Sequence, residues 1–134
     1  MSFIELTKDE LVGVISIDEQ HQSMANLVNK LYEKINSHDK KVIGNYLNKL
    51  LELLEIHFAN EENLMRSTKF EGYISHKLEH DRLYRKMLAS TDNFSKGVEQ
   101  IGIEHLTGIK NWFHNHIEIS DKKCGKYLVE NGIS

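Results

Sequence analysis

The chain has 134 residues, of which 40% are hydrophobic and 28% are charged, and this length and composition predict one domain over residues 1–134. Its formal net charge is -3 and it has no block of basic residues, so we expect no binding to nucleic acid or to an anionic membrane surface. No apolar run approaches the roughly 18 residues that cross a membrane, and no transmembrane helix is predicted.

Four amphipathic helices are predicted, because apolar residues recur at steps of three and four and no proline interrupts them. Asp18 is the expected N-cap of the first helix, since an aspartate side chain can accept a hydrogen bond from the first turn. The helices are expected at residues 19–37, 39–66 and 73–95, and along a fourth segment from Ile101 to His116 whose start is marked by Gly97 and Gly102.

The loops between these helices are short and polar, so consecutive helices are expected to be antiparallel neighbours. This predicts an all-α fold, an up-down-up-down four-helix bundle. The apolar face of each helix also carries histidine or acidic residues where leucine would be expected. Because these faces point at one another in a bundle, the sequence predicts a metal site in the core.

Two pairs have the spacing of ligands on one helix face. His57 and Glu61 are four residues apart, as are His76 and His80, and residues four apart lie about one turn from each other. A mixture of imidazoles and carboxylates favours iron, manganese, copper or zinc, because calcium and magnesium sites are built almost wholly from oxygen ligands.

A single histidine on an apolar face is more often a core residue than a ligand, and His21 alone would be interpreted that way. Five imidazoles and two carboxylates in one small core are different, because burying them is prohibitively unfavourable without a cation or fixed partners. Three histidines are expected to have no metal role: His38, which lies near a helix end and is expected to be solvated, and His105 and His114, which lack a spacing partner. Glu62 and Glu118 are each turned about 100° from a metal-facing neighbour and are expected to face water.

Asp121 does not follow from regular helix geometry. It is five residues from His116, which turns it about 140° away on an α-helix. A π-type widening or a helix end is required for both side chains to reach one site.

The predicted ligands fall in four motifs: Ile17-Asp18-Glu19-Gln20-His21, His57-Phe58 with Glu61-Glu62, His76-x-x-x-His80, and Trp112-x-x-x-His116-Ile117-x-x-x-Asp121. Together these motifs resemble the metal-binding pattern of the hemerythrins, and the length is similar to that of single-domain bacteriohemerythrins. The resemblance implies two non-haem iron ions joined by an oxo or hydroxo bridge. It implies that His76, His80 and His116 bind one iron, that His21 and His57 bind the other, and that Glu61 and Asp121 bridge both.

The resemblance also implies the ligand. One coordination position stays open on the iron with two imidazoles, where dioxygen would bind reversibly in a dry, apolar pocket. The residues that match the family's pocket positions are Met24, Phe58, Trp112, Phe113 and Ile117. Phe113 stands where leucine is more common.

We therefore expect an oxygen-binding protein, not an enzyme, that serves oxygen storage, delivery or sensing. One alternative is a di-iron oxidase or peroxide scavenger, although such sites are richer in glutamate and usually carry Glu-x-x-His motifs. Another is a sensor module for oxygen, nitric oxide or iron, which would normally have an output domain. The absence of a recognisable secretory signal, and a single cysteine, Cys124, favour a cytoplasmic location. No protein partner is indicated.

Overall fold

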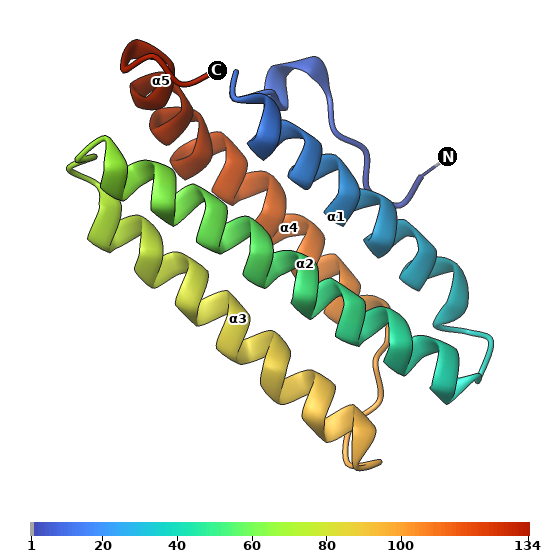
Figure 1. The fold of residues 1–134 in the computed structure, drawn as a ribbon. Coiled ribbons are helices and arrows are strands. Elements are labelled where there is room, and N and C mark those ends of the chain that lie inside the picture. Colours follow the sequence, from blue (N-terminus) through green and yellow to red (C-terminus); the bar gives the residue numbers. More distant parts are fainter. Residues whose placement is uncertain (1) are drawn as a thin grey trace.

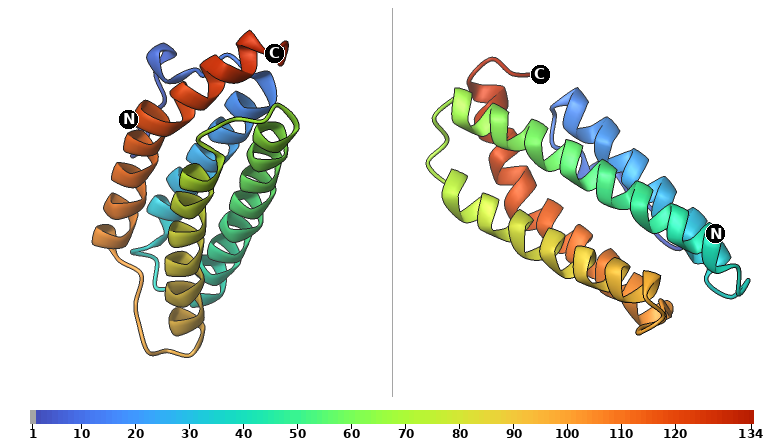
Figure 2. Two further views of the ribbon diagram at one scale, coloured as in Figure 1. Left: turned by 90° about the vertical axis from the view of Figure 1, so that its left-hand side faces the viewer. Right: turned by 60° about the horizontal axis from the view of Figure 1, so that its bottom comes forward.

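Four long helices lie side by side in a computed structural model that describes residues 2–134 (Figure 1). They are α1 (Ile15–Lys34), α2 (Lys40–Ser67), α3 (Tyr73–Ser95) and α4 (Ile103–His116). Consecutive helices run in opposite directions (Figures 1 and 2), and no strand occurs among the described residues. The predicted all-α, up-down-up-down four-helix bundle is confirmed.

A π-helical turn joins α4 to a short C-terminal helix. The turn, η2, spans Ile117–Asp121, and α5 follows at Lys122–Glu130. A π-turn contains one residue more than an α-turn, so residues five apart come onto one face. The prediction that His116 and Asp121 need a widened turn or a helix end is confirmed.

The helix boundaries follow local capping. The carboxylate of Asp39 accepts a hydrogen bond from the Val42 N–H at 3.2 Å, which satisfies one of the free donors at the start of α2. The third helix has the predicted bounds, Tyr73–Ser95. The fourth begins at Ile103, directly after Gly102, one of the two glycines that marked its start.

Asp18 is not the N-cap of the first helix, and that prediction was wrong. Helix α1 begins at Ile15, so Asp18 lies inside its first turn. The carboxylate instead accepts hydrogen bonds from the backbone N–H groups of Val12 at 2.8 Å and Gly13 at 3.2 Å. Gly13 has a positive φ of 89°, which turns the preceding segment back toward α1 and brings these donors within reach of Asp18.

The bundle core is formed by apolar side chains from all the long helices and from the C-terminal segment. Leu31, Leu50, Met65, Ile117 and Leu128 are among its fully buried members. The N-terminal segment is fastened to this core, because the Ile4 N–H donates to Asn29 Oδ1 at 2.8 Å. Over residues 2–134, no helix combines the length and apolar character that crossing a membrane requires.

Candidate metal centre

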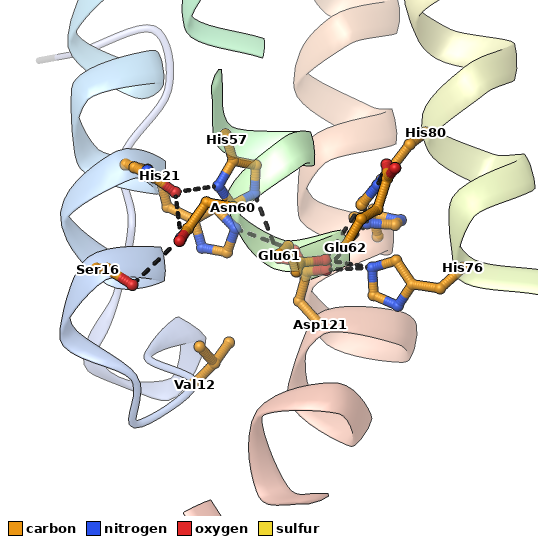
Figure 3. Close-up of polar contacts among 12 residues, drawn as sticks. Val12, Ser16, His21, His57, Asn60, Glu61, Glu62, His76, His80 and Asp121 are labelled. Carbon is orange, nitrogen blue, oxygen red and sulfur yellow. Dashed lines mark hydrogen bonds and ion pairs between the residues drawn. The ribbon is translucent and has the colours of Figure 1, made fainter. Parts of the chain in front are cut away.

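Seven buried polar side chains meet between the helices, in the half of the bundle that contains the α2–α3 turn and the start of α1. The contributions are His21 from α1, His57 and Glu61 from α2, His76 and His80 from α3, His116 from α4, and Asp121 from η2. None is more than 5% exposed. Figure 3 shows His21 of α1 and His76 of α3 on opposite sides of the Glu61 and Asp121 carboxylates. The structure therefore brings together all seven residues that the sequence pattern selected.

The seven side chains form two groups that share both carboxylates. One group contains Glu61, His76, His80, His116 and Asp121, and the other contains His21, His57, Glu61 and Asp121. In each group, one candidate ligand atom per residue lies within 4.8 Å of all the others. The histidines are thus divided three to two between adjacent positions.

Each carboxylate directs one oxygen toward each group. Asp121 Oδ1 lies 2.9 Å from His116 Nε2 and 3.0 Å from His76 Nε2. Its other oxygen, Oδ2, lies 3.0 Å from His21 Nε2. In the same way Glu61 Oε1 contacts the Nε2 atoms of His76 and His80, while Oε2 lies 3.4 Å from His57 Nε2. Two carboxylates with this orientation can bridge a pair of metal ions.

The carboxylate and imidazole atoms of the centre lie close together, but several of them make no hydrogen bond. Both oxygens of Glu61, both oxygens of Asp121, and the Nε2 atoms of His21 and His76 are buried without a partner in hydrogen-bond geometry. An unsatisfied buried polar atom costs about 1–3 kcal/mol, and more when it is charged. A cation among them would compensate all six atoms at once.

The tautomers of two imidazoles support the same interpretation. His80 Nδ1 lies 2.9 Å from Glu62 Oε2, and His116 Nδ1 lies 2.7 Å from Glu79 Oε2. A carboxylate oxygen only accepts, so each Nδ1 donates, and a ring that is neutral in this orientation has no proton on Nε2. These two Nε2 atoms face each other at 3.2 Å. Their lone pairs repel unless a proton or a metal ion lies between them.

His57 is oriented by a polar network at the α1–α2 contact. Its Nδ1 donates to Gln20 Oε1 at 2.8 Å, and the Asn60 amide donates to that same oxygen at 3.0 Å. The network continues from Asn60 to Ser16 Oγ at 3.2 Å (Figure 3). His57 therefore also directs Nε2 toward the centre.

The residues behind the imidazoles were not identified from the sequence. Gln20, Glu62 and Glu79 each lie one position from a candidate ligand, and that adjacency is the signal available in the sequence. The expectation that Glu62 faces water was wrong, because a rotation of about 100° from Glu61 turns it toward α3, where His80 needs an acceptor. Glu118 is exposed as expected and pairs with Lys122 at 2.9 Å.

The electrostatics of the centre favour bound positive charge. Burial lowers the pKa of His57 to about 4, so this ring stays neutral and keeps a lone pair for a metal. Burial acts against ionisation of Asp121 too, but the adjacent imidazoles outweigh it and hold the pKa of that carboxyl well below its ordinary value. For His76 the carboxylates of Asp121 and Glu61 outweigh burial and raise the pKa to about 10.

Aromatic side chains surround the imidazoles. Phe58 stacks on His80 with ring centroids 3.9 Å apart and an interplanar angle of 8°. Trp112 stacks on His116 at 4.4 Å and 12°. The edge contact of Phe113 with His21 has a centroid distance of 5.3 Å. The remaining two predicted pocket residues, Met24 and Ile117, are buried in the adjoining apolar core.

The remaining histidines lie outside the centre, as expected. His105 Nε2 contacts Glu99 Oε1 at 3.0 Å, and His114 pairs with Glu10. His38 is exposed in the turn between α1 and α2. Neither metal-compatible group found among the described residues includes any of them.

Comparison with known proteins links this geometry to one family. The model of the hemerythrin HHE cation-binding domain matches residues 12–128. A bacteriohemerythrin of Aquifex aeolicus is 33% identical over 129 residues, which cover 93% of this chain and 97% of the relative. One from Methylococcus capsulatus is 29% identical over 83% of this chain and 85% of the relative. A solved crystal structure of wild-type hemerythrin superposes with a TM-score of 0.92 at 27% identity, covering 95% of this chain and 98% of that one.

Proposed function

This chain belongs to the hemerythrin family, and from that premise we propose that it binds dioxygen reversibly at a non-haem di-iron centre, for oxygen storage, delivery or sensing. The observation that carries the proposal is the pair of ligand groups sharing Glu61 and Asp121. A site for one metal would need neither the second group nor carboxylates whose two oxygens point in different directions.

Seven residues would hold the two iron ions. His76, His80 and His116 would bind one iron, His21 and His57 the other, and Glu61 and Asp121 both. The iron ions would supply the electrons for reversible oxygenation. The three-to-two division of imidazoles supports an open position on the side of His21 and His57, because that side has one protein ligand fewer.

The protein residues around the centre would fix the imidazoles and exclude water. Gln20, Glu62 and Glu79 accept hydrogen bonds from three Nδ1 atoms and so keep the corresponding Nε2 atoms directed inward. The proposed pocket would be lined by apolar side chains of the adjoining core, which bring no acidic proton: Met24, Phe58, Trp112, Phe113 and Ile117. Exclusion of protons and water favours binding and release of dioxygen over its reduction.

The composition of the ligand set favours binding over oxidation. Five of the seven residues are imidazoles, whereas the di-iron oxidases and peroxide scavengers of ferritin-like bundles rely on glutamates and Glu-x-x-His pairs. An enzyme of that kind remains the alternative, and its distinguishing property is turnover of dioxygen or peroxide.

Elemental analysis combined with an anaerobic oxygen titration tests the proposal. Protein from iron-sufficient cells is expected to contain two iron ions per chain. After reduction without air, one dioxygen should bind per centre, and purging with argon should restore the reduced spectrum.

Three results would contradict the proposal. One metal ion per chain, or zinc in preference to iron on reconstitution, would exclude a di-iron centre. Oxygen exposure that yields the ferric protein with continuing peroxide release or substrate oxidation would identify an enzyme instead.

A further inference from the structure

A cavity of about 430 Å³ opens between α2, α3 and α4, outside the candidate metal centre. Its walls are mainly apolar, and Leu47, Leu83, Met87, Ile101 and Trp112 contribute to them. Pockets of roughly 300–1,000 Å³ with apolar walls and a few polar groups are typical of small-molecule sites. This cavity therefore has the size and lining to enclose a small organic ligand.

The hydroxyl of Thr91 is an unpaired polar group in this cavity. Thr91 lines the cavity and is only 7% exposed, yet its Oγ1 has no hydrogen-bond partner. Most buried hydroxyls in proteins are hydrogen-bonded, and an exception calls for an explanation. A polar atom of a bound ligand would supply the missing partner.

The exposed rim of the cavity carries unpaired positive charge. Arg82 and Lys86 lie one turn apart on α3, and neither forms an ion pair within 4.0 Å in the described part of the chain. Glu104, on α4, is the one acidic residue that lines the cavity. Together with Arg82 and Lys86 it gives the rim a net charge of +1. His105 does not change this balance, because its ring nitrogens contact Glu99 and the Gly102 N–H.

We propose that this cavity binds a small carboxylate with an apolar body. The hydrocarbon part would lie against Leu83, Met87 and Trp112, and the carboxylate would pair with Arg82 and Lys86. Dioxygen on its way to the metal centre would need neither two unpaired cations nor a buried hydroxyl. Trp112 stacks on His116, so the ligand would lie one aromatic ring from the candidate metal centre.

Gly108 provides a way to close the cavity without touching its charged groups. It lines the cavity from α4, and a Cβ atom added there meets nothing within 4 Å. Phenylalanine at this position would occupy the open space, whereas alanine would add only one methyl group. The matched variants are therefore Gly108→Phe and Gly108→Ala, and neither alters a candidate metal ligand.

Titration calorimetry of the metal-loaded protein with octanoate and with 1-octanol tests the proposal. Octanoate should bind at one saturable site in the wild type and in Gly108→Ala, and should lose measurable binding in Gly108→Phe. The double variant Arg82→Gln/Lys86→Gln should bind octanoate about tenfold more weakly, as expected when charge-assisted hydrogen bonds are removed. 1-Octanol, which has the same hydrocarbon chain without the negative charge, should bind the wild type less tightly than octanoate.

Three results would overturn it. A wild-type protein that shows no saturable octanoate binding at millimolar concentration would exclude the cavity as a site for this class of ligand. Binding that persists in Gly108→Phe, with unchanged circular dichroism, would place the ligand elsewhere. Equal affinity for 1-octanol and octanoate would show that Arg82 and Lys86 do not recognise the carboxylate.

Discussion

At the scale of single residues, the side chains behind the imidazoles decide which ring nitrogen faces the centre. Gln20, Glu62 and Glu79 each accept from an Nδ1 atom. Glu79 also accepts a hydrogen bond from Ser120 Oγ at 2.8 Å, which fixes the carboxylate relative to η2. These acceptors fix the orientation of three candidate ligands, His57, His80 and His116.

Loss of the Glu79 acceptor is expected to weaken metal binding without removing a ligand. Glu79→Ala should lower iron affinity about 10–100-fold, the usual effect of losing a hydrogen-bond partner of a ligating histidine. Glu79→Gln should have a smaller effect, because its amide oxygen still accepts from His116. Competition with a chelator under anaerobic conditions measures this. Glu118→Gln is the control, since Glu118 is exposed, and an equal loss of affinity in that variant would contradict the prediction.

Phe113 is expected to limit solvent access to the side of the centre that holds His21. It is 7% exposed and makes an edge contact with the His21 ring. Phe113→Ala should retain two iron ions per chain but accelerate autoxidation of the oxygenated protein and azide binding to the ferric protein. Phe113→Leu, which keeps most of the apolar bulk, should change both rates less. Unchanged rates in a fully loaded Phe113→Ala protein would identify Phe113 as ordinary core packing.

At the scale of elements, apolar periodicity predicted the four long helices, and their type and order follow from it. The bounds of α3 were predicted to the residue. Glycines flank this helix in the sequence, with Gly72 directly before Tyr73 and Gly97 two residues after Ser95. The start of α1 was placed four residues late, because Asp18 has the chemistry of an N-cap, and only the folded segment at Val12 and Gly13 reveals a different donor. The role of Glu62 likewise depends on which helix lies beside it.

The spacing of His116 and Asp121 predicted an irregular turn between them but not which kind of turn. A separation of five required an irregularity between His116 and Asp121, but two kinds of irregularity satisfied that requirement. The observed turn keeps the chain helical into α5, so Asp121 has helical backbone on both sides, the π-turn before it and α5 after it. The turn thereby positions one of the two carboxylates shared by both ligand groups.

Deletion of Ile119 is expected to preserve the centre. Ile119 is 71% exposed and lies within the π-turn, and removing one residue there would restore a regular α-helix with the same residues on each face. His116 and Asp121 would then be four apart and would still share a face. Insertion of one alanine after Ile119 should instead rotate Asp121 by about 100° and lower the iron content. Iron analysis of both variants tests this, and loss of iron on deletion would contradict it.

The N-terminal 3₁₀ helix η1 (Lys8–Glu10) is expected to attach to α4 in a pH-dependent way. Partial burial tends to raise the pKa of Glu10, but hydrogen bonding from the Thr7 N–H and contact with His114 outweigh it and lower that pKa. A lowered folded-state pKa stabilises the fold above the ordinary pKa of glutamate, and the contribution is lost as pH falls through the lowered value.

Glu10→Gln should therefore destabilise the protein at neutral pH by about 0.5–1 kcal/mol, within the range for the net contribution of a hydrogen bond. Urea unfolding at a series of pH values measures the difference from the wild type, which should shrink as the solution becomes acidic. Glu5→Gln is a suitable control, because Glu5 is exposed. A difference that stays constant down to acidic pH would show that the charge of Glu10 contributes nothing.

At the scale of the whole molecule, the seven candidate metal ligands occupy positions in the core of the bundle that apolar side chains would otherwise fill. Glu61 and Asp121 are 0% and 1% exposed, and the five imidazoles around them occupy positions where apolar packing would stabilise the fold. Burying a charged pair is often less favourable than burying apolar residues of the same volume. Stability and metal binding are consequently linked, because the ions compensate the buried charge that the fold alone does not satisfy.

Iron is therefore expected to stabilise the folded protein strongly. Free iron at 100 times the dissociation constant contributes about 2.7 kcal/mol when it binds the folded state alone. For a domain of this size that corresponds to a rise in Tm of roughly 10 °C, measurable by calorimetry with and without a chelator under anaerobic conditions. Asp121→Asn should lose most of this rise, because it removes a charge shared by both ligand groups. His38→Asn should keep it, since His38 is exposed, and asparagine tolerates the positive φ of 60° at that position. An equal Tm with and without iron in the wild type would show that the buried polar cluster is satisfied by the protein itself.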